Sequence, residues 1–290
     1  MKWTQMQLEK AKDAISQRLK AFKLPAFGII QPEGGEASET VRSILVVLFP
    51  YFAGYQKGNL SLYCRGLDYH EVVPQYLNPI GEEVKRILGA GFSYHAYADT
   101  GPFIDRQLAQ RAGLGFVGDN QMLIHEEYGS YFFIGYLTMN APFSPDIRYK
   151  TDMPQECLHC GRCQQACPGQ ALPIKKGEAF KSERCRSGIS QKSGELKTWE
   201  IVILKKDAII FGCDLCQTVC PYNQNLALSP LPEFTENCVT SLRKEDLEGL
   251  SRKQLMERYP NRAFVWRGPA VLRRNLTLLG SDEKGIKNGD

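Results

Sequence analysis

The spacing of apolar and polar residues in the first half of the chain predicts one helix and two buried strands. Between residues 4 and 22 the apolar positions recur at helical spacing among charges; they are Met6, Leu8, Ala11, Ile15, Leu19 and Phe22. The run SILVVLFP at 43–50 is short and continuously apolar, which is typical of a strand buried on both faces. Residues 131–139, YFFIGYLTM, are rich in aromatic side chains and predict a second strand.

Weaker patterns between these two strands predict further elements. The segments at 60–64 and 91–98 have the composition of short strands, and those at 69–90 and 102–112 have helical spacing. Because helices and strands alternate, we expect an α/β domain over residues 1–145.

The rest of the chain follows a different pattern. Residues 146–225 are rich in turns and cysteines and have little periodic apolar character, as expected where metal replaces an apolar core. Residues 226–290 contain helical patterns at 241–259 and 268–280, and then ten polar residues that we expect to be frayed. We therefore expect a metal-binding module at 146–225 and a helical C-terminal segment after it.

The composition is that of a soluble protein. The 290 residues are 43% hydrophobic and 23% charged. The most apolar stretch, at 43–54, is too short to span a bilayer and contains Pro50, and the N-terminus lacks a signal-peptide pattern. We therefore expect a cytoplasmic protein with no membrane segment. In a reducing compartment, a chain with ten cysteines is expected to bind metal rather than to form disulfides.

Eight of the cysteines form two motifs and a bridging residue. The first motif, CLHCGRCQQACP, contains Cys157, Cys160, Cys163 and Cys167; the second, CDLCQTVCP, contains Cys213, Cys216 and Cys220; Cys185 lies between them. In two-cluster ferredoxins, three cysteines of the first kind of run hold one cubane and the fourth ligates the other. This rule gives set A, which is Cys157, Cys160, Cys163 and Cys220, and set B, which is Cys167, Cys185, Cys213 and Cys216. We therefore predict two [4Fe–4S] clusters.

A pair of zinc sites is the alternative for these cysteines. Zinc sites usually place CxxC pairs on either side of a longer loop, rather than three close cysteines and a CP dipeptide. Cys64 and Cys238 belong to neither set, and on spacing alone we expect ordinary buried thiols. A ferredoxin module would be far shorter than this chain, so we expect the clusters to serve a reaction in the first domain.

Three features of the first domain are candidates for that reaction. Asp99, in YADTGP, could donate a proton if it is partly desolvated, or it could cap the helix that follows. The segment GLGFVG at 113–118 matches GxGxxG, but a dinucleotide site needs a strand before it and a helix after it, and here that order is reversed. We expect its glycines to make a tight turn or to approach another ligand closely. His70 and His125 are expected to serve packing or hydrogen bonding.

Positive charge is concentrated near the C-terminus, although the formal net charge of the chain is only +4. The basic residues between 252 and 274 are Arg252, Lys253, Arg258, Arg262, Arg267, Arg273 and Arg274, against Glu257 alone. This segment could bind a polyanion, or it could be a solvated helix face.

Several segments together resemble the cobalamin-dependent epoxyqueuosine reductases of tRNA queuosine biosynthesis. They are YCRGLDYHEVV at 63–73, ADTGPFIDRQLAQRAGLGFVGDNQMLI at 98–124, GSYFFIGYL at 129–137, the first cysteine run, FGCDLCQTVCPYN at 211–223 and GPAVLRRNLTLLG at 268–280. The resemblance covers roughly residues 40–280, and the order of the motifs is more specific than any one of them. It implies an α/β cobalamin-binding domain, similar to that of reductive dehalogenases, followed by a two-cluster ferredoxin-like module.

The resemblance also implies an activity and its residues. The family removes the epoxide oxygen of epoxyqueuosine at the tRNA wobble position, with two electrons and two protons. Electrons would pass from an external one-electron donor, such as flavodoxin or ferredoxin, through the clusters to cobalamin, and Asp99 would be the general acid. The implied cofactor contacts are Cys64, Arg65, Tyr69, His70, Arg106, Gly113, Gly115, Gly118 and Asn120. The tRNA anticodon stem-loop would then contact Arg258, Arg262, Arg267, Arg273 and Arg274, and we expect a monomer.

The chain also departs from the family pattern. Many members have Lys and Thr where Asp119 and Gln121 stand, and Asp105–Arg106 replaces a Glu–Arg pair. Longer members have a C-terminal helical-repeat domain, which we expect to be absent from this short form. Two other functions stay open: a cobalamin-dependent reductase of a small epoxide or organohalide, and a two-cluster electron-transfer protein. The candidate proton donor argues against the electron carrier, which needs none.

Overall fold

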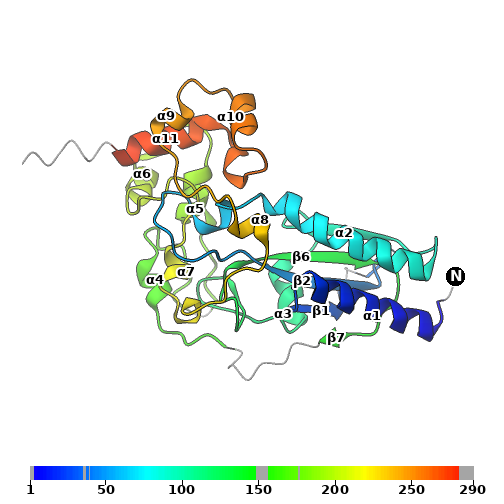
Figure 1. Ribbon diagram of the computed structural model, residues 1–290. Helices are drawn as coiled ribbons and strands as arrows, with labels where there is room; N and C mark the ends of the chain where they lie inside the picture. The colour runs from blue at the N-terminus through cyan, green and yellow to red at the C-terminus, as the bar shows by residue number, and fades with distance from the viewer. Residues whose placement is uncertain (1–2, 35–36, 39, 148–155, 176, 281–290) are drawn as a thin grey trace, which may run out of the picture.

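The computed structural model describes residues 3–34, 37–38, 40–147, 156–175 and 177–280 (Figure 1). The first half contains α1 (Gln5–Ala21), β1 (Phe27–Ile30), β2 (Ser43–Pro50), α2 (Tyr69–Leu88), β3 (Tyr94–Ala98), α3 (Asp105–Arg111), β4 (Phe116–Val117), β5 (Leu123–Ile124), β6 (Phe132–Met139) and β7 (Asp146–Ile147). The second half contains short helices: α4 (Arg162–Ala166), α5 (Arg186–Gln191), α6 (Thr198–Leu204), α7 (Leu215–Thr218), α8 (Pro232–Thr235), α9 (Lys244–Leu247), α10 (Arg252–Arg258) and α11 (Pro269–Gly280).

Five strands form one sheet in the order β3-β6-β2-β1-β7, and every pair of neighbours is antiparallel. The central strand is β2, in which Leu45 pairs with Ile29 of β1 on one side and with Leu137 of β6 on the other. All of β2 is buried, as its continuous apolar run predicts. The strands β4 and β5 form a separate two-stranded hairpin.

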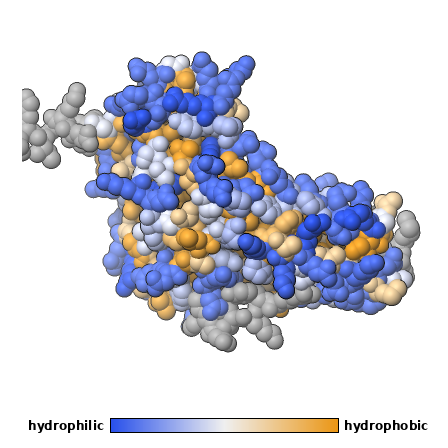
Figure 2. Space-filling model, in the orientation of Figure 1, coloured by the Kyte–Doolittle hydropathy of each residue, from blue (hydrophilic) through white to orange (hydrophobic). Residues whose placement is uncertain are grey.

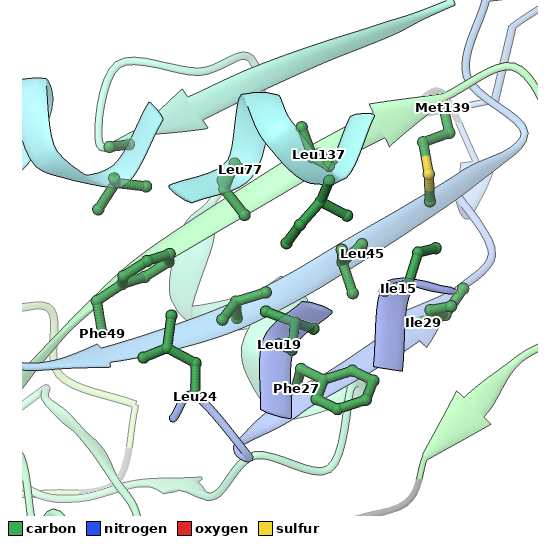
Figure 3. Packing of buried hydrophobic residues seen from close by; sticks show 14 of the residues in the cluster. Ile15, Leu19, Leu24, Phe27, Ile29, Leu45, Phe49, Leu77, Leu137 and Met139 are labelled. Carbon is green, nitrogen blue, oxygen red and sulfur yellow. The ribbon is translucent and has the colours of Figure 1, made fainter. Parts of the chain in front are cut away.

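Helices cover both faces of this sheet. On one face, Ile15 and Leu19 of α1 point toward Leu45 of β2, and Leu77 of α2 lies beside them (Figure 3). The alternate residues of β2 point the other way and pack against Leu108 and its neighbours in α3. Because successive strand residues face opposite sides, one short strand serves two apolar cores.

Most of the expected elements of the first domain are present, and one is wrong. Thr4 caps α1 and Asp68 caps α2 by accepting backbone hydrogen bonds. The strand expected at 60–64 is instead a 3₁₀ turn, Leu62–Cys64, because the partly buried Asp214 carboxylate accepts from Ser61 Oγ and the Leu62 N–H and bends the chain there. The pattern also misses β1, whose four residues are too few for a periodicity to emerge.

The C-terminal helices form a lobe that packs back onto the first half of the chain (Figure 1). Leu60 and the Cys64 thiol share a core with Phe211, Leu242 and Phe264. Hydrophilic residues cover most of the outer surface of this lobe (Figure 2). The helix expected at 241–259 is divided into α9 and α10 by Gly249, at a φ of 67° that favours glycine. The polar tail lies outside the described residues. Within the described residues, every helix is too short or too polar to cross a bilayer.

A buried amide fastens α11 to the cysteine region. Asn275 is fully buried, and its Nδ2 donates to the carbonyls of Ser190 and Ile210, both at 2.7 Å. We expect Asn275→Ala to destabilise the fold by about 1–3 kcal/mol, because two buried carbonyls lose their donors. The thermal unfolding midpoint at matched iron content should fall by several degrees, while the exposed neighbour Thr277→Ala should leave it unchanged. Equal midpoints for both variants would contradict this role.

Candidate active site and cysteine clusters

A cavity of about 590 Å³ opens between the sheet domain and the cysteine region. Aromatic side chains, among them Tyr51, Tyr69 and Phe133, form much of the wall on the sheet side. All four cysteines of set B also line this cavity. A large, mainly apolar cavity with a few convergent polar groups is the usual form of a cofactor or substrate site.

The cysteines of set B come together from three segments. Cys167 ends α4, Cys185 precedes α5, and Cys213 and Cys216 lie at the start of α7. Burial raises the pKa of the Cys216 thiol well above its usual value, and the neighbouring cysteines of the set raise it further. Uncompensated thiolates would be unfavourable here, so the site favours a cation or a positively charged cluster core.

The cysteines of set A line a second, smaller cavity of about 20 Å³. Gly118, Asp119 and Asn120 of the first domain also line it. The two sets given by the spacing rule thus line two different cavities, and residues of the first domain line both.

The distances between sulfur atoms bear on the choice between zinc and iron–sulfur clusters. Within the described residues, the only three metal-ligand side chains whose ligand atoms all lie within 4.8 Å of one another are Asp119, Cys157 and His159. Tetrahedral zinc, with Zn–S bonds of about 2.3 Å, would hold its thiolates about 3.8 Å apart. Among the described residues, no three cysteines of either set lie within that 4.8 Å limit of one another. A cubane binds each cysteine through a different iron and holds the sulfurs farther apart than zinc does.

Asp99 lies at the rim of the large cavity, directly after β3. Its backbone is left-handed, with a φ of 63°, and its N–H donates to Asp105 Oδ2 at 3.1 Å. The Tyr69 hydroxyl donates to Asp99 Oδ2 at 3.1 Å, and His70 Nε2 lies 3.7 Å from the same oxygen. The N-cap of α3 is Ile104, so Asp99 does not cap that helix. Its side chain is 66% exposed and faces the cavity mouth instead.

The two neighbouring carboxyl groups have pKa values shifted in opposite directions. The hydrogen bond with His70 lowers the pKa of Asp99 more than burial raises it, and Tyr69 lowers it further. Burial raises the pKa of Asp105 to about 6, and Asp105 Oδ1 is buried with no hydrogen-bond partner among the described residues. Adjacent acids with separated pKa values are a common arrangement for acid–base chemistry.

His70 connects Asp99 to a third carboxylate. His70 Nδ1 lies 2.8 Å from Asp68 Oδ1, and the hydrogen bonds to Asp68 and Asp99 raise the pKa of His70 to about 9. The imidazole is therefore protonated at neutral pH and holds a proton beside Asp99. His70 therefore serves hydrogen bonding, as expected. Its partners are Asp99, the candidate acid, and Asp68, the N-cap of α2.

The structure separates the implied cofactor contacts into two groups. Tyr69, Arg106 and Asn120 line the large cavity. Cys64 and Arg65 lie behind its wall, where the fully buried Cys64 thiol donates to the Ser61 carbonyl and the Arg65 guanidinium donates to the carbonyls of Gln56 and Leu60. These two residues brace the wall through the turn that precedes α2.

The glycines of GLGFVG make close backbone contacts. Gly115 has a φ of 136°, and a Cβ atom there would lie 2.1 Å from the Ile124 carbonyl oxygen. Gly113 is also left-handed and faces Ile147, while Gly118 lines the smaller cavity. The segment thus forms a turn into the β4–β5 hairpin that reaches the set A cysteines.

Of the five arginines that the resemblance implies as tRNA contacts, three are bound to the protein itself. Arg262 is buried and donates to the carbonyls of Arg65 and Asn237, and Arg273 donates to those of Leu247 and Leu250. Arg274 donates to the Lys192 carbonyl at 2.7 Å and to the Gly194 carbonyl.

The other two arginines lie at the surface. Arg258 pairs with Asp246 at 3.3 Å, and the guanidinium of Arg267 lies 3.6 Å from the ring centroid of the exposed Trp266. The segment is therefore only partly a solvated face.

Two polar residues in the cavity wall were not predicted from the sequence. Arg186 follows Cys185 directly and is almost completely buried, and Gln217 donates to the Ser130 carbonyl and hydroxyl. The position of Arg186 beside a cluster cysteine is the one signal in the sequence that could have identified it.

Comparisons with known proteins agree with this arrangement. A family model described as "4Fe-4S double cluster binding domain" matches residues 156–223, which include all eight cysteines, and one described as "Epoxyqueuosine reductase QueG, DUF1730" matches residues 35–100. An epoxyqueuosine reductase of Synechocystis sp. is 30% identical over 252 residues, covering 83% of each chain. This chain belongs to the epoxyqueuosine reductase family. The prediction of two [4Fe–4S] clusters is thereby confirmed.

Other epoxyqueuosine reductases are longer, so a larger part of each lies outside the matched region. That of Lactococcus garvieae is 36% identical over 223 residues, covering 77% of this chain and 61% of the relative. The enzyme of Bacillus subtilis is 33% identical over 223 residues, which cover 75% of this chain and 55% of the relative. The chain thus spans roughly half to three fifths of the length of these relatives.

Solved epoxyqueuosine reductases have the same fold. The enzyme from Streptococcus thermophilus superposes with a TM-score of 0.77 at 26% identity, over 92% of this chain and 80% of that one. A structure of an epoxyqueuosine reductase with an epoxyqueuosine-modified tRNA stem loop superposes with a TM-score of 0.79 at 23% identity. The match covers 94% of this chain and 81% of that one. The expected fold, an α/β domain followed by a ferredoxin-like cluster module, is confirmed.

Proposed function

We propose that this chain reduces epoxyqueuosine to queuosine in tRNA. The observation that carries the proposal is that Asp99 and the four cysteines of set B line one cavity, with His70 Nε2 lying 3.7 Å from the Asp99 carboxylate. The reaction consumes two electrons and two protons; the epoxide oxygen leaves as water, and a carbon–carbon double bond forms. One wall of the cavity can supply electrons and the rim can supply protons.

The cysteines present fit two clusters. Set A would hold one [4Fe–4S] cluster beneath residues 118–120, and set B would hold the other at the wall of the large cavity. Electrons from an external one-electron donor, such as flavodoxin or ferredoxin, would reach the cavity through set B. We further propose that the protein acts in the cytoplasm as a monomer.

The large cavity fits cobalamin in its chemistry. Its aromatic wall suits the apolar face of a broad ring, and Asn120, Gln121 and Gln217 can meet polar edges. Tyr69 and Arg106 would stand beside the ring, and the glycine turn would support the hairpin behind it. When bound, cobalamin would supply strongly reducing chemistry next to the set B cluster.

The residues at the rim would move the protons. Asp99 Oδ2 would donate to the departing oxygen, and His70 Nε2, which is charged at neutral pH, would return a proton to Asp99. Asp68 keeps the imidazole oriented and charged. The Tyr69 hydroxyl holds the Asp99 carboxylate toward the cavity.

The direct test is mass spectrometry of tRNA nucleosides from a strain that lacks this gene. Accumulated epoxyqueuosine, which disappears when the wild-type gene is restored, would support the function. Normal queuosine in the deletion strain would refute it.

A tRNA-binding surface is proposed at the exposed part of the basic segment. Trp266 and Arg267 stack on each other at the surface, an arrangement that suits an unpaired base and its phosphate. Arg258 would add a second phosphate contact. Arg262, Arg273 and Arg274 would help by holding the lobe together rather than through the contacts first expected of them.

We expect the double variant Arg258→Ala/Arg267→Ala to weaken tRNA binding and flatten its salt dependence. Each lost phosphate contact changes the slope of log K against log salt by about 0.7 to 0.9, so two contacts give about 1.5. The control is Lys10→Ala/Lys20→Ala, which removes the same charge from the exposed side of α1. Identical slopes for both variants would contradict a specific contact at Trp266 and Arg267.

A small-molecule reductase is the second candidate function. It is favoured by the three arginines whose guanidinium groups are bound to backbone carbonyls, which leaves fewer free guanidinium groups for RNA. If the purified protein binds no tRNA at any salt concentration, this candidate becomes the better one.

We expect reconstituted protein to contain eight irons and eight sulfides. Cys216→Ala and Cys220→Ala should each fall to about four irons, because each removes a ligand of one set and leaves the other set intact. Cys238→Ala, outside both sets, should keep eight. Iron and sulfide analysis after anaerobic reconstitution gives the result, and zinc in place of iron would refute the assignment.

A further inference from the structure

The side chain of Arg186 is a buried positive charge at the set B cysteines. The residue follows Cys185, is 1% exposed and lines the large cavity together with the four cysteines. Its guanidinium makes five hydrogen bonds to the carbonyls of Leu204, Asp207, Ile209 and Gly212. Backbone carbonyls fix its position but carry no net charge.

The negative groups near Arg186 include a cysteine of set B as well as two carboxylates at longer range. Within the described part of the chain, no carboxylate forms an ion pair with Arg186, although Asp207 and Asp214 act on it at longer range. Burial lowers the pKa of Arg186, and the charge of Cys213 and a side-chain hydrogen bond to Cys213 act in the opposite direction. A buried guanidinium without a paired anion is costly, so its natural partner is a negatively charged cluster.

Within the part of the chain that the structure describes, no buried cation lines the set A cavity. The arginine at its cavity is Arg162, which is exposed to water, and Asp119 adds a carboxylate there. Charge in water is screened strongly, whereas charge fixed in a buried wall is screened much less.

We propose that Arg186 raises the reduction potential of the set B cluster above that of the set A cluster. A [4Fe–4S] cluster on four thiolates is negative and gains one more negative charge on reduction, so an adjacent fixed cation stabilises the reduced form. Electrons that enter at set A would then pass downhill to the cluster beside the cavity. The inference rests on the proposed assignment of the clusters but not on the identity of the substrate.

The test is a redox titration of the reconstituted protein followed by electron paramagnetic resonance. In Arg186→Gln, one of the two clusters should become harder to reduce by at least tenfold in its equilibrium constant, about 59 mV for a one-electron couple. Arg186→Lys keeps the charge and should recover most of that shift. Arg262→Gln is the matched control, since Arg262 is also buried on carbonyls but lies outside the cavity walls, and both its midpoints should be unchanged.

Two results would overturn the proposal: unchanged midpoints in Arg186→Gln, or equal shifts in Arg186→Gln and Arg186→Lys. If Arg186→Gln does not assemble its clusters, the same redox titration is made on Cys160→Ala. This variant lacks a ligand of set A, so that only the set B cluster remains to be titrated. That remaining cluster should have the higher of the two wild-type midpoints, and the lower one would refute the proposal. Because no substrate is needed, failure of the proposed enzymatic function would leave this result intact.

Discussion

Asp99→Asn should retain both clusters and lose about 100- to 10,000-fold in turnover, the usual contribution of a positioned general acid. The amide can still accept from the Tyr69 hydroxyl, so the rim should keep its shape. It cannot pass a proton from His70 to the substrate. Turnover of modified tRNA, or of its anticodon stem-loop, under saturating reductant measures the effect.

The matched control for Asp99→Asn is Glu71→Gln. Glu71 is an exposed carboxylate in the first turn of α2, next to His70 in sequence, and its loss should leave turnover unchanged. Near-wild-type turnover in Asp99→Asn would show that the proton reaches the substrate by another route. Loss of iron from the variant would make the turnover uninformative, so iron content is measured on the same samples.

The imidazole of His70 offers a second measurement on the same variant. The hydrogen bonds to Asp68 and Asp99 together hold the pKa of His70 at about 9. With an amide at position 99, one of these supports is gone and the pKa of His70 should fall. Nuclear magnetic resonance of the imidazole in wild type and variant follows this change without any assay of turnover.

The cysteine sets were predictable because their ligands come from a short-range rule. The CxxCxxCxxxCP spacing assigns Cys167 to the other set before any fold is known, and the structure brings Cys167 to the same cavity as Cys213. Likewise β2 was predictable, since its run of apolar residues from Ile44 to Phe49 needs burial on both faces.

What the sequence could not give depends on contacts between distant segments. The turn at Leu62 exists because Asp214, some 150 positions later, accepts its N–H. The buried state of Arg262 depends on the carbonyls of Arg65 and Asn237. A run of basic residues looks the same in sequence whether its charges face water or backbone carbonyls, so the number of arginines overestimates the free positive charge.

Asp105→Asn should have opposite effects on stability and on activity. Asp105 has an ordinary pKa of 3.8 when unfolded and about 6 in the fold, because burial disfavours its charged form. Above pH 6 the fold therefore bears the cost of a partly buried charge, and below the unfolded pKa it bears none. Each tenfold change in a protonation equilibrium corresponds to about 1.4 kcal/mol, so the cost, discounted for solvent screening, is about 1–2 kcal/mol. The asparagine variant should be more stable than wild type by that amount at pH 8 and equal to it near pH 3.5.

The same substitution should lower turnover at pH 8 by about tenfold. The charge of Asp99 raises the pKa of Asp105, and because this repulsion is mutual, ionised Asp105 disfavours the ionised form of Asp99. An amide removes that repulsion but still accepts the Asp99 N–H, so the left-handed turn is kept while Asp99 becomes harder to protonate. Thermal unfolding from pH 3.5 to 8 and a pH profile of turnover measure the two effects.

Asp99→Asn is the comparison variant, because it should lower both stability and turnover at pH 8. The pKa of Asp99 is lowered in the fold, so its carboxylate stabilises the fold above the unfolded pKa, and losing that carboxylate should destabilise the protein at pH 8. A stable Asp105→Asn protein with full turnover would show that the buried carboxylate serves neither purpose.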